Sequence, residues 1–337
     1  MSELPSKMKE HAFRDKVVPV LSALLLVFLI FLIPVLFLGA LAKWGRMLHP
    51  KTINSQVVIY TSQDQEYAEP ILREFEKQTG IRARAVYDSE AAKTVGLVNR
   101  LIAESAHPQC DVFWNSEEFR IHQLAARNIF REQDGWKAFG YRSRRLVVNT
   151  NLLALAAAPR SWSELTNAHW RGKIALSYPL FGTVATHFLA LRQSWGDARW
   201  QAWCRALQAN QPLVVDGNSV VVKLVGSGEA WLGMTDSDDI AAGQREHLPI
   251  AALPLTEDSL LIPNTVAVVR DAPHAAAAQK LFDYLQSPEV VAKLVAARAL
   301  EGASINEVVT ATLKPNWPEL LRDLEPATAT LKNIFLR

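Results

Sequence analysis

The sequence predicts an α/β protein with two lobes and an apolar segment in front of them. Short β-branched runs alternate with helical patterns, which is typical of parallel sheets covered by helices. The predicted elements form a first unit and then a second unit of different character, after which the chain returns to the first unit. The 295 residues after Ala42 are also enough for two lobes with separate hydrophobic cores.

The apolar segment covers residues 17–42 and contains 26 residues without a charged side chain. As a helix it would be roughly 39 Å long, which exceeds the ~30 Å hydrocarbon core of a bilayer. We expect an uncleaved membrane anchor, with residues 1–16 as a cytoplasmic N-terminal tail. A cleaved secretory signal is the alternative, because Ala40, Leu41 and Ala42 offer a small-x-small cleavage site. Both interpretations place the remaining chain on or across a membrane.

Charge and motifs exclude several classes of function. The whole chain has 36 Lys and Arg, of which four lie before residue 17, and 34 Asp and Glu, of which three do. The remaining chain therefore has 32 basic and 31 acidic residues. A net charge near +1 gives no electrostatic argument for binding nucleic acid. The sequence has no H-E-x-x-H, G-x-S-x-G or phosphate-loop motif, so we expect no enzyme. The distant Cys110 and Cys204 are expected to be buried free thiols.

The elements of the first unit follow from its apolar patterns. A continuous β-branched run at residues 57–60 predicts a strand that is buried on both faces. The helix after it carries Ile71, Leu72 and Phe75 at helical spacing and is closed by Gly80 at the C′ position. The predicted order is strand 57–60, helix 65–79, strand 82–86, helix 94–105 and strand 111–114.

The second unit begins after a strand at residues 146–149. Its predicted strands are 173–176, 214–215, 231–234, 250–253 and 265–269, and its helices start near residues 161, 182, 197 and 217, before a helical tail. Two chain crossings are expected, near Leu146 and near Ile250. We assign residues 51–146 and 262–337 to lobe I and residues 147–261 to lobe II.

Small polar residues recur at the ends of the predicted strands. Ligands of open parallel sheets lie beyond the carboxyl ends of the strands. Backbone N–H groups at helix starts carry a partial positive charge, so they favour oxyanions. The alternative is that each residue only caps a helix. The predicted ligand-binding residues are Thr61, Ser62, Asn115, Ser116, Gly182, Thr183, Asn218, Ser219 and Asp236.

Residues 236–239 form the one acidic concentration at a predicted strand end. A carboxylate there could bind a metal ion or an amine. The alternative is that these residues only stabilise the first turn of a helix through its dipole.

Several stretches of the chain resemble the ferric-iron type of substrate-binding proteins of ABC importers. The stretches are 57–63, 75–81, 111–115, 233–239, 262–267, 272–274 and 281–289, and the resemblance covers roughly residues 56–296. It implies a type II periplasmic-binding-protein fold, in which two lobes joined by a strand hinge close on a ligand. It also implies an ABC permease and its ATPase as partners, and a place on the periplasmic side of the inner membrane, or free in the periplasm after cleavage. A membrane-anchored sensor or adaptor with the same fold is the alternative function.

The sequence departs from the iron-binding pattern of that family. Ferric binders of this type usually use a tyrosine pair in the second lobe, and the matching stretch 235–239 has none. Asp64 stands where many members place a metal-ligating histidine, and Glu117 is near the place of a metal-ligating glutamate. With Asp236 and Asp238 they are the predicted ligands if a metal is bound. Both a carboxylate-bound metal and an oxyanion or phosphonate-like solute stay open, and we expect no cofactor beside the ligand.

Overall fold

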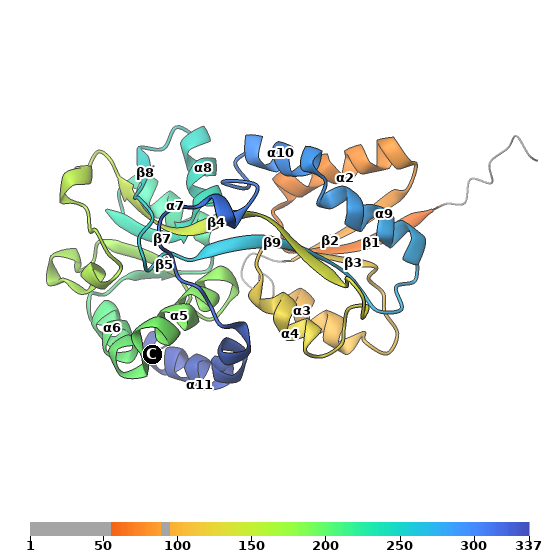
Figure 1. The fold of residues 1–337 in the computed structure, drawn as a ribbon. Coiled ribbons are helices and arrows are strands. Elements are labelled where there is room, and N and C mark those ends of the chain that lie inside the picture. The colour runs from red at the N-terminus through yellow and green to blue at the C-terminus, as the bar shows by residue number, and fades with distance from the viewer. Residues whose placement is uncertain (1–54, 89–94, 337) are drawn as a thin grey trace, which may run out of the picture. The chain divides into compact units, whose positions relative to one another are not determined.

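A computed structural model describes residues 55–88 and 95–336 of the chain (Figure 1). The predicted anchor or signal at residues 17–42 and the predicted cytoplasmic tail lie outside this part. Among the described residues, none of the helices combines the length and the hydropathy needed to cross a bilayer.

The first lobe is an α/β layer built on parallel strands. Strand β1 pairs in parallel with β2 on one side and with β3 on the other. Helices α2, α9 and α10 cover one face of this sheet, and α3 and α4 cover the other (Figure 1). The elements are β1 (Gln56–Thr61), α2 (Gln65–Thr79), β2 (Arg82–Tyr87), α3 (Val95–Ala103), β3 (Val112–Asn115), α4 (Phe119–Ala125), α9 (Ala275–Leu285) and α10 (Pro288–Ala296).

Two long antiparallel strands, β4 (Trp136–Asn149) and β9 (Leu261–Val268), join the lobes. Strand β4 pairs with β9 as far as Ser143, and from Arg144 onward it pairs with β7 (Leu232–Asp236). The strand order is therefore β2-β1-β3-β9-β4-β7-β5-β6, with β8 (Ile250–Ala252) on the other edge of β4. The change of partner on β4 between Ser143 and Arg144 lies close to the crossing predicted near Leu146.

The chain does not return near Ile250, because β8 still pairs with β4 inside the second lobe; it returns along β9, which begins at Leu261, next to the lobe boundary assigned at residue 262. This strand was predicted to begin at residue 265 rather than 261 because of Pro263. Proline lacks the N–H group that a hydrogen-bonded strand pair needs, so it argues against a strand. A register irregularity between Phe139 and Tyr141 accommodates Pro263. Gly140, which lies between them, has φ +57°, and a Cβ atom there would come within 2.4 Å of Leu300 Cδ1.

The second lobe repeats the parallel arrangement around a tryptophan-rich core. Strand β5 pairs in parallel with β6 and β7. Trp162, Trp200 and Phe188 are fully buried in its hydrophobic core. The helix predicted near residue 161 is only a 3₁₀ turn, Ser163–Thr166. The other elements are β5 (Ile174–Ser177), α5 (Gly182–Trp195), α6 (Asp197–Ala209), β6 (Leu213–Val215), α7 (Asn218–Ser227) and α8 (Ser237–Arg245).

The C-terminal helix α11 (Trp317–Phe335) lies against α5 and α6 of the second lobe and also against α4 of the first lobe (Figure 1). Its buried face, formed by Leu320, Ala327, Leu331 and Phe335, belongs to the hydrophobic core of the second lobe. This differs from the predicted grouping of residues 262–337 with the first lobe. The physical reason is that an amphipathic helix packs where an apolar surface is left open, whatever lobe precedes it in sequence.

Candidate functional site

A small cavity lies where the hinge strand β4 meets the strand ends and helix starts. Its volume is about 40 Å³. The first lobe contributes Ser116, the loop residue after β3, and the hinge contributes Arg142. The remaining lining residues come from the second lobe and are Ser177, Tyr178, Phe181, Gly182, Thr183, Val184, Asp216, Gly217, Asn218, Asp236 and Asp239.

Two helices point uncapped N-termini at this cavity. Phe181 is the N-cap of α5 and Gly217 is the N-cap of α7, and neither position provides a side-chain hydrogen bond to its helix. The first N–H groups of a helix have no intrahelical acceptor, so they are available to a ligand. Together with the helix dipoles, they make the cavity a favourable place for an anionic group.

Asp236, at the end of β7, is held by donors from three elements, β4, α5 and α7. Arg144 Nη1 donates to its Oδ1 at 2.7 Å, and Thr183 Oγ1 and Asn218 Nδ2 donate to Oδ2 at 2.7 and 3.1 Å. Burial opposes ionisation of this carboxyl, but Arg144 and Arg142 outweigh it and hold its pKa below the ordinary value. Asp236 is therefore a buried carboxylate inside a positively charged cage.

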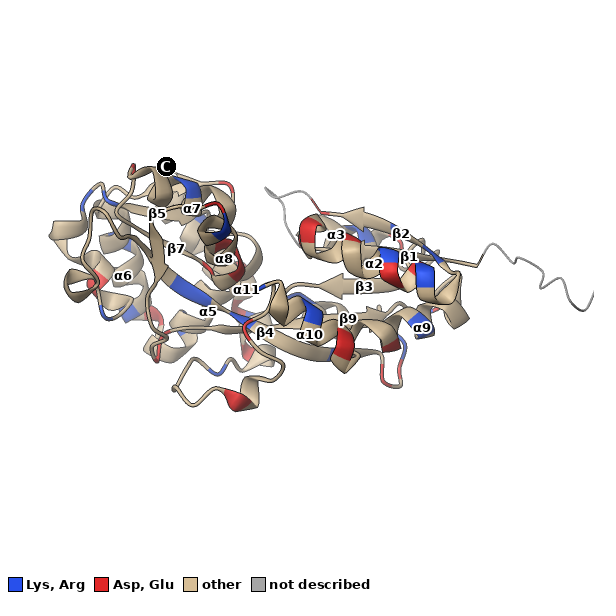
Figure 2. Ribbon diagram, turned by 90° about the horizontal axis from the view of Figure 1, so that it is seen from above, with Lys and Arg blue, Asp and Glu red and all other residues tan. Residues whose placement is uncertain are grey.

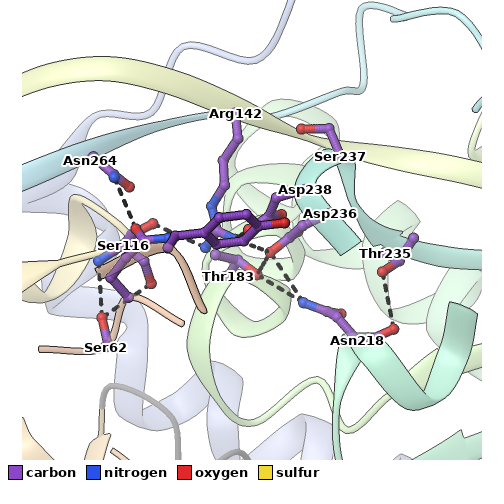
Figure 3. Close-up of polar contacts among 12 residues, drawn as sticks. Ser62, Ser116, Arg142, Thr183, Asn218, Thr235, Asp236, Ser237, Asp238 and Asn264 are labelled. Atoms are coloured by element: carbon purple, nitrogen blue, oxygen red, sulfur yellow. Dashed lines mark hydrogen bonds and ion pairs between the residues drawn. The ribbon is translucent and has the colours of Figure 1, made fainter. Parts of the chain in front are cut away.

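Arg142 connects this cage to the first lobe. Its Nη1 pairs with Asp238 and lies 3.5 Å from Asp236 Oδ2, while its Nη2 donates to the Ser116 carbonyl at 3.1 Å (Figure 3). Burial disfavours its charged form, yet Asp238 and Asp236 outweigh burial and raise its pKa. The basic positions of β4 accordingly lie beside the acidic first turn of α8 (Figure 2).

Both arginines keep N–H groups that no described residue accepts. Nε of Arg142, and Nε and Nη2 of Arg144, are buried and have no acceptor in the described part of the chain. A buried donor without a partner costs about 1–3 kcal/mol, so a site that can take an anion or ordered water next to them is favoured.

The structure brings five of the nine predicted ligand-binding residues to the cavity, namely Ser116, Gly182, Thr183, Asn218 and Asp236. Ser62 and Asn115 do not line the cavity but hold Ser116, which does. Ser62 Oγ donates to Asn115 Oδ1 at 2.6 Å and accepts from Ser116 N at 2.9 Å. Thr61 Oγ1 accepts from the backbone N–H of Gln63, a local turn contact. Ser219 lies in the first turn of α7 and does not line the cavity.

The four predicted metal ligands are distributed differently. Asp236 and Asp238 form a group with Asp239, with ligand atoms within 4.8 Å of one another. Glu117 instead accepts from the backbone N–H groups of Phe119 and Arg120 at 2.8 and 3.2 Å, at the start of α4. Burial raises the pKa of Glu117. Asp64 is the N-cap of α2, and neither it nor Glu117 lines the cavity.

Arg142 and Arg144 are the functional residues that the sequence analysis missed. The predicted strand began at Leu146, whereas β4 begins at Trp136. The signal was present, because two arginines at positions i and i+2 of a strand project to the same face. The sequence would have predicted this arginine pair only if the strand had been extended toward the N-terminus, through the charged residues before Leu146.

The family follows from comparison with known proteins. Residues 57–297 match the family model of the bacterial extracellular solute-binding proteins. The chain belongs to this family. The resemblance to the ferric-binding type, noted from the sequence, is thereby confirmed.

Two relatives of this solute-binding protein are named for different ligands. The Fe(3+)-binding periplasmic protein of Serratia marcescens is 26% identical over 196 residues, which cover 53% of this chain and 56% of the relative. A putative 2-aminoethylphosphonate-binding periplasmic protein of Salmonella typhimurium is 28% identical over 236 residues, 64% of this chain and 67% of the relative. The match thus spans little more than half of the first relative and about two thirds of the second.

Solved structures confirm the two-lobed fold of the solute-binding protein. Iron-bound HitA from Pseudomonas aeruginosa has a TM-score of 0.72 at 18% identity, covering 83% of this chain and 99% of that chain. AfuA from Actinobacillus pleuropneumoniae with fructose-6-phosphate bound has a TM-score of 0.68 at 16% identity, covering 82% and 99%. At such identities the likeness establishes the fold alone.

Proposed function

We propose that this solute-binding protein is the periplasmic component of an ABC importer and that it binds an oxyanion or phosphonate-like solute in the cavity beside β4. The observation that carries the proposal is the meeting of two uncapped helix N-termini, α5 and α7, with Arg142, which lines the same cavity and has a buried Nε–H group without an acceptor among the described residues. An anionic group there replaces its hydration with oriented donors.

The same geometry argues against a metal ion as the ligand. Asp236 already accepts hydrogen bonds on both oxygens, and Asp238 pairs with Arg142. A metal ion would have to displace these guanidinium groups, whose positive charge also repels it. Tyr178 is the single tyrosine among the described residues that line the cavity, so the chain lacks a tyrosinate pair there.

The cavity also has features that suit an amino group on the solute. Asp216 and Asp239 line it together with the helix starts, and Asp216 is exposed. A volume of about 40 Å³ holds a compact group, so a longer substituent extends toward solvent. An aminoalkylphosphonate, the kind of solute for which the Salmonella typhimurium relative is named, fits this distribution of charge.

Calorimetric titration of the full-length protein with 2-aminoethylphosphonate, inorganic phosphate and ferric iron tests the proposal. We expect the anions to bind, and Ser116→Ala to weaken them about tenfold or more, because a hydrogen bond to a charged group contributes about 1.5–3 kcal/mol. Ser227→Ala, an exposed serine at the end of α7, is the matched control. Iron that binds tightly, with no affinity for either anion, would contradict the proposal.

Asp239→Asn separates the two anions. It removes negative charge from the cavity, so we expect weaker binding of 2-aminoethylphosphonate and unchanged or stronger binding of inorganic phosphate. Equal effects on both solutes would show that Asp239 does not contact an amino group.

Residues 17–42 are proposed to anchor the protein to the periplasmic face of the inner membrane, next to the permease and ATPase that receive the solute. N-terminal sequencing of the mature protein from membrane fractions is expected to begin near Met1. A sequence that begins at Lys43 would establish a cleaved signal instead.

A further inference from the structure

The C-terminal helix α11 is fixed to the second lobe along most of its length. Arg192 of α5 donates to Asp323 at 2.6 Å, and the backbone N–H of Asn316 donates to Gln193 Oε1 at 2.9 Å. Leu320 and Phe335 are buried in the core of that lobe. The helix therefore moves with α5 and α6.

Trp317, the first residue of α11, faces the other lobe. Its ring stacks on the ring of His122 with centroids 5.1 Å apart at 21°, and it lies 6.3 Å from Phe119 at 30°. Both partners are on α4, which is also anchored in the first lobe, because Leu124 is buried in a core cluster there. The ring of His122 also makes a T-shaped contact with Trp136, with ring centroids 5.1 Å apart. The stacking of Trp317 on His122 and Phe119 thus links the two lobes outside the hinge strands.

The helix that Trp317 contacts also carries the first-lobe side of the cavity. Glu117 caps α4 by accepting from the backbone N–H of Phe119, and the preceding residue, Ser116, lines the cavity. Thr186 of α5 donates to Glu117 at 3.3 Å, a further contact between the lobes. A movement of α4 relative to α5 therefore carries Ser116 with it and changes the position of Ser116 relative to the helix starts of the second lobe.

We propose that Trp317 is a positioning residue that acts as a joint between α4 and α11, and that it sets the balance between open and closed cleft without touching the solute. In the described arrangement Ser116 and the second-lobe helix starts share one cavity while Trp317 is stacked on α4. The stack thus stabilises the arrangement in which both lobes reach the solute. Loosening it shifts the population toward open forms, and the apparent affinity falls in proportion.

The test measures the distance between the lobes in the full-length protein by pairs of spin labels. Lys280→Cys on α9 and Lys223→Cys on α7 place the labels on exposed sites, and the native Cys110 and Cys204 are buried. Without solute, Trp317→Ala is expected to shift the distance distribution toward longer values. His122→Ala should give the same shift from the α4 side, and Trp317→Phe should restore the wild-type distribution, because it keeps an aromatic ring on the stack.

A matched control separates the joint from general loss of packing. Ile334→Ala removes a half-buried apolar side chain from the same helix, on the face that packs against the second lobe. We expect it to lower the melting temperature and leave the distance distribution unchanged. Unchanged distributions in both Trp317→Ala and His122→Ala would overturn the proposal.

The effect on affinity rests on the proposed function, whereas the distance measurement does not. With 2-aminoethylphosphonate as the probe, Trp317→Ala is expected to raise Kd about twofold to tenfold, the range that one aromatic contact supports. If wild-type protein fails to bind the probe, the proposed solute is wrong, and the distances alone decide the role of Trp317. Longer distances with an unchanged Kd would contradict the link between the joint and binding.

Discussion

Asp236→Ala is expected to lower the free energy of unfolding by about 3–5 kcal/mol, the cost of removing one partner from a buried ion pair. The change leaves the fully buried Arg144 without its carboxylate partner and removes one of the carboxylates beside Arg142. It also leaves the hydroxyl of Thr183 without its acceptor. Urea unfolding at neutral pH, followed by circular dichroism, measures the loss.

Asp216→Ala is the matched control for this substitution. It removes an aspartate from the same cavity, but from an exposed position, and such changes usually alter stability by less than about 0.5 kcal/mol. A loss below about 1 kcal/mol for Asp236→Ala would mean that the cage around Asp236 contributes little to folding. The expected instability also means that solute affinity should be tested through Ser116 and Asp239 rather than through Asp236.

Acidification below pH 6.5 is expected to destabilise the protein through His187. This histidine of α5 is fully buried, and burial, with Arg144 nearby, lowers its pKa to about 3. The unfolded chain binds a proton near pH 6.5 and the folded chain does not, so stability falls as the pH drops between these values. The slope approaches about 1.4 kcal/mol per pH unit. Urea unfolding between pH 7.5 and 4.5 should show a contribution of about 2–3 kcal/mol.

His187→Gln isolates this contribution, because glutamine keeps a donor toward the Asp258 carbonyl that His187 contacts at 2.7 Å. Other carboxyls change stability in the same experiment. Glu117, with its raised pKa, opposes the trend, while the lowered pKa of Asp236 adds acid sensitivity below about pH 4. The difference between wild type and variant cancels both. A difference that stays constant with pH would show that His187 does not titrate as expected.

The fold was predictable because its main signals are local. Buried parallel strands such as β1 need continuous apolar residues, and the helices between them show their own spacing. The return strand β9 and the C-terminal helix α11 were harder to place. Pro263 conceals a strand whose pairing depends on an irregularity in β4, and the position of α11 depends on which apolar surface remains uncovered.

The candidate site was predictable where its groups come from the backbone. Gly182 and Asn218 open helices α5 and α7, and strand-to-helix turns carry such residues in a recognisable pattern. Arg142 and Arg144 were missed because buried arginines are rare, so their place in β4 depends on acidic partners about 90 residues away in the chain. Glu117 was assigned to a metal from its sequence position, whereas its hydrogen bonds place it at the start of α4.

The uncapped starts of α5 and α7 have a consequence for how such a protein diverges. A recognition surface made of main-chain amides persists through almost every amino-acid replacement, since substitution alters side chains and leaves the peptide groups in place. Substitution of the residues around it, such as Asp216, Asp239 and Phe181, changes the side chains that line the cavity. Under the proposed function, a few such substitutions can therefore exchange one solute for another while the main-chain amides that bind the anion are kept.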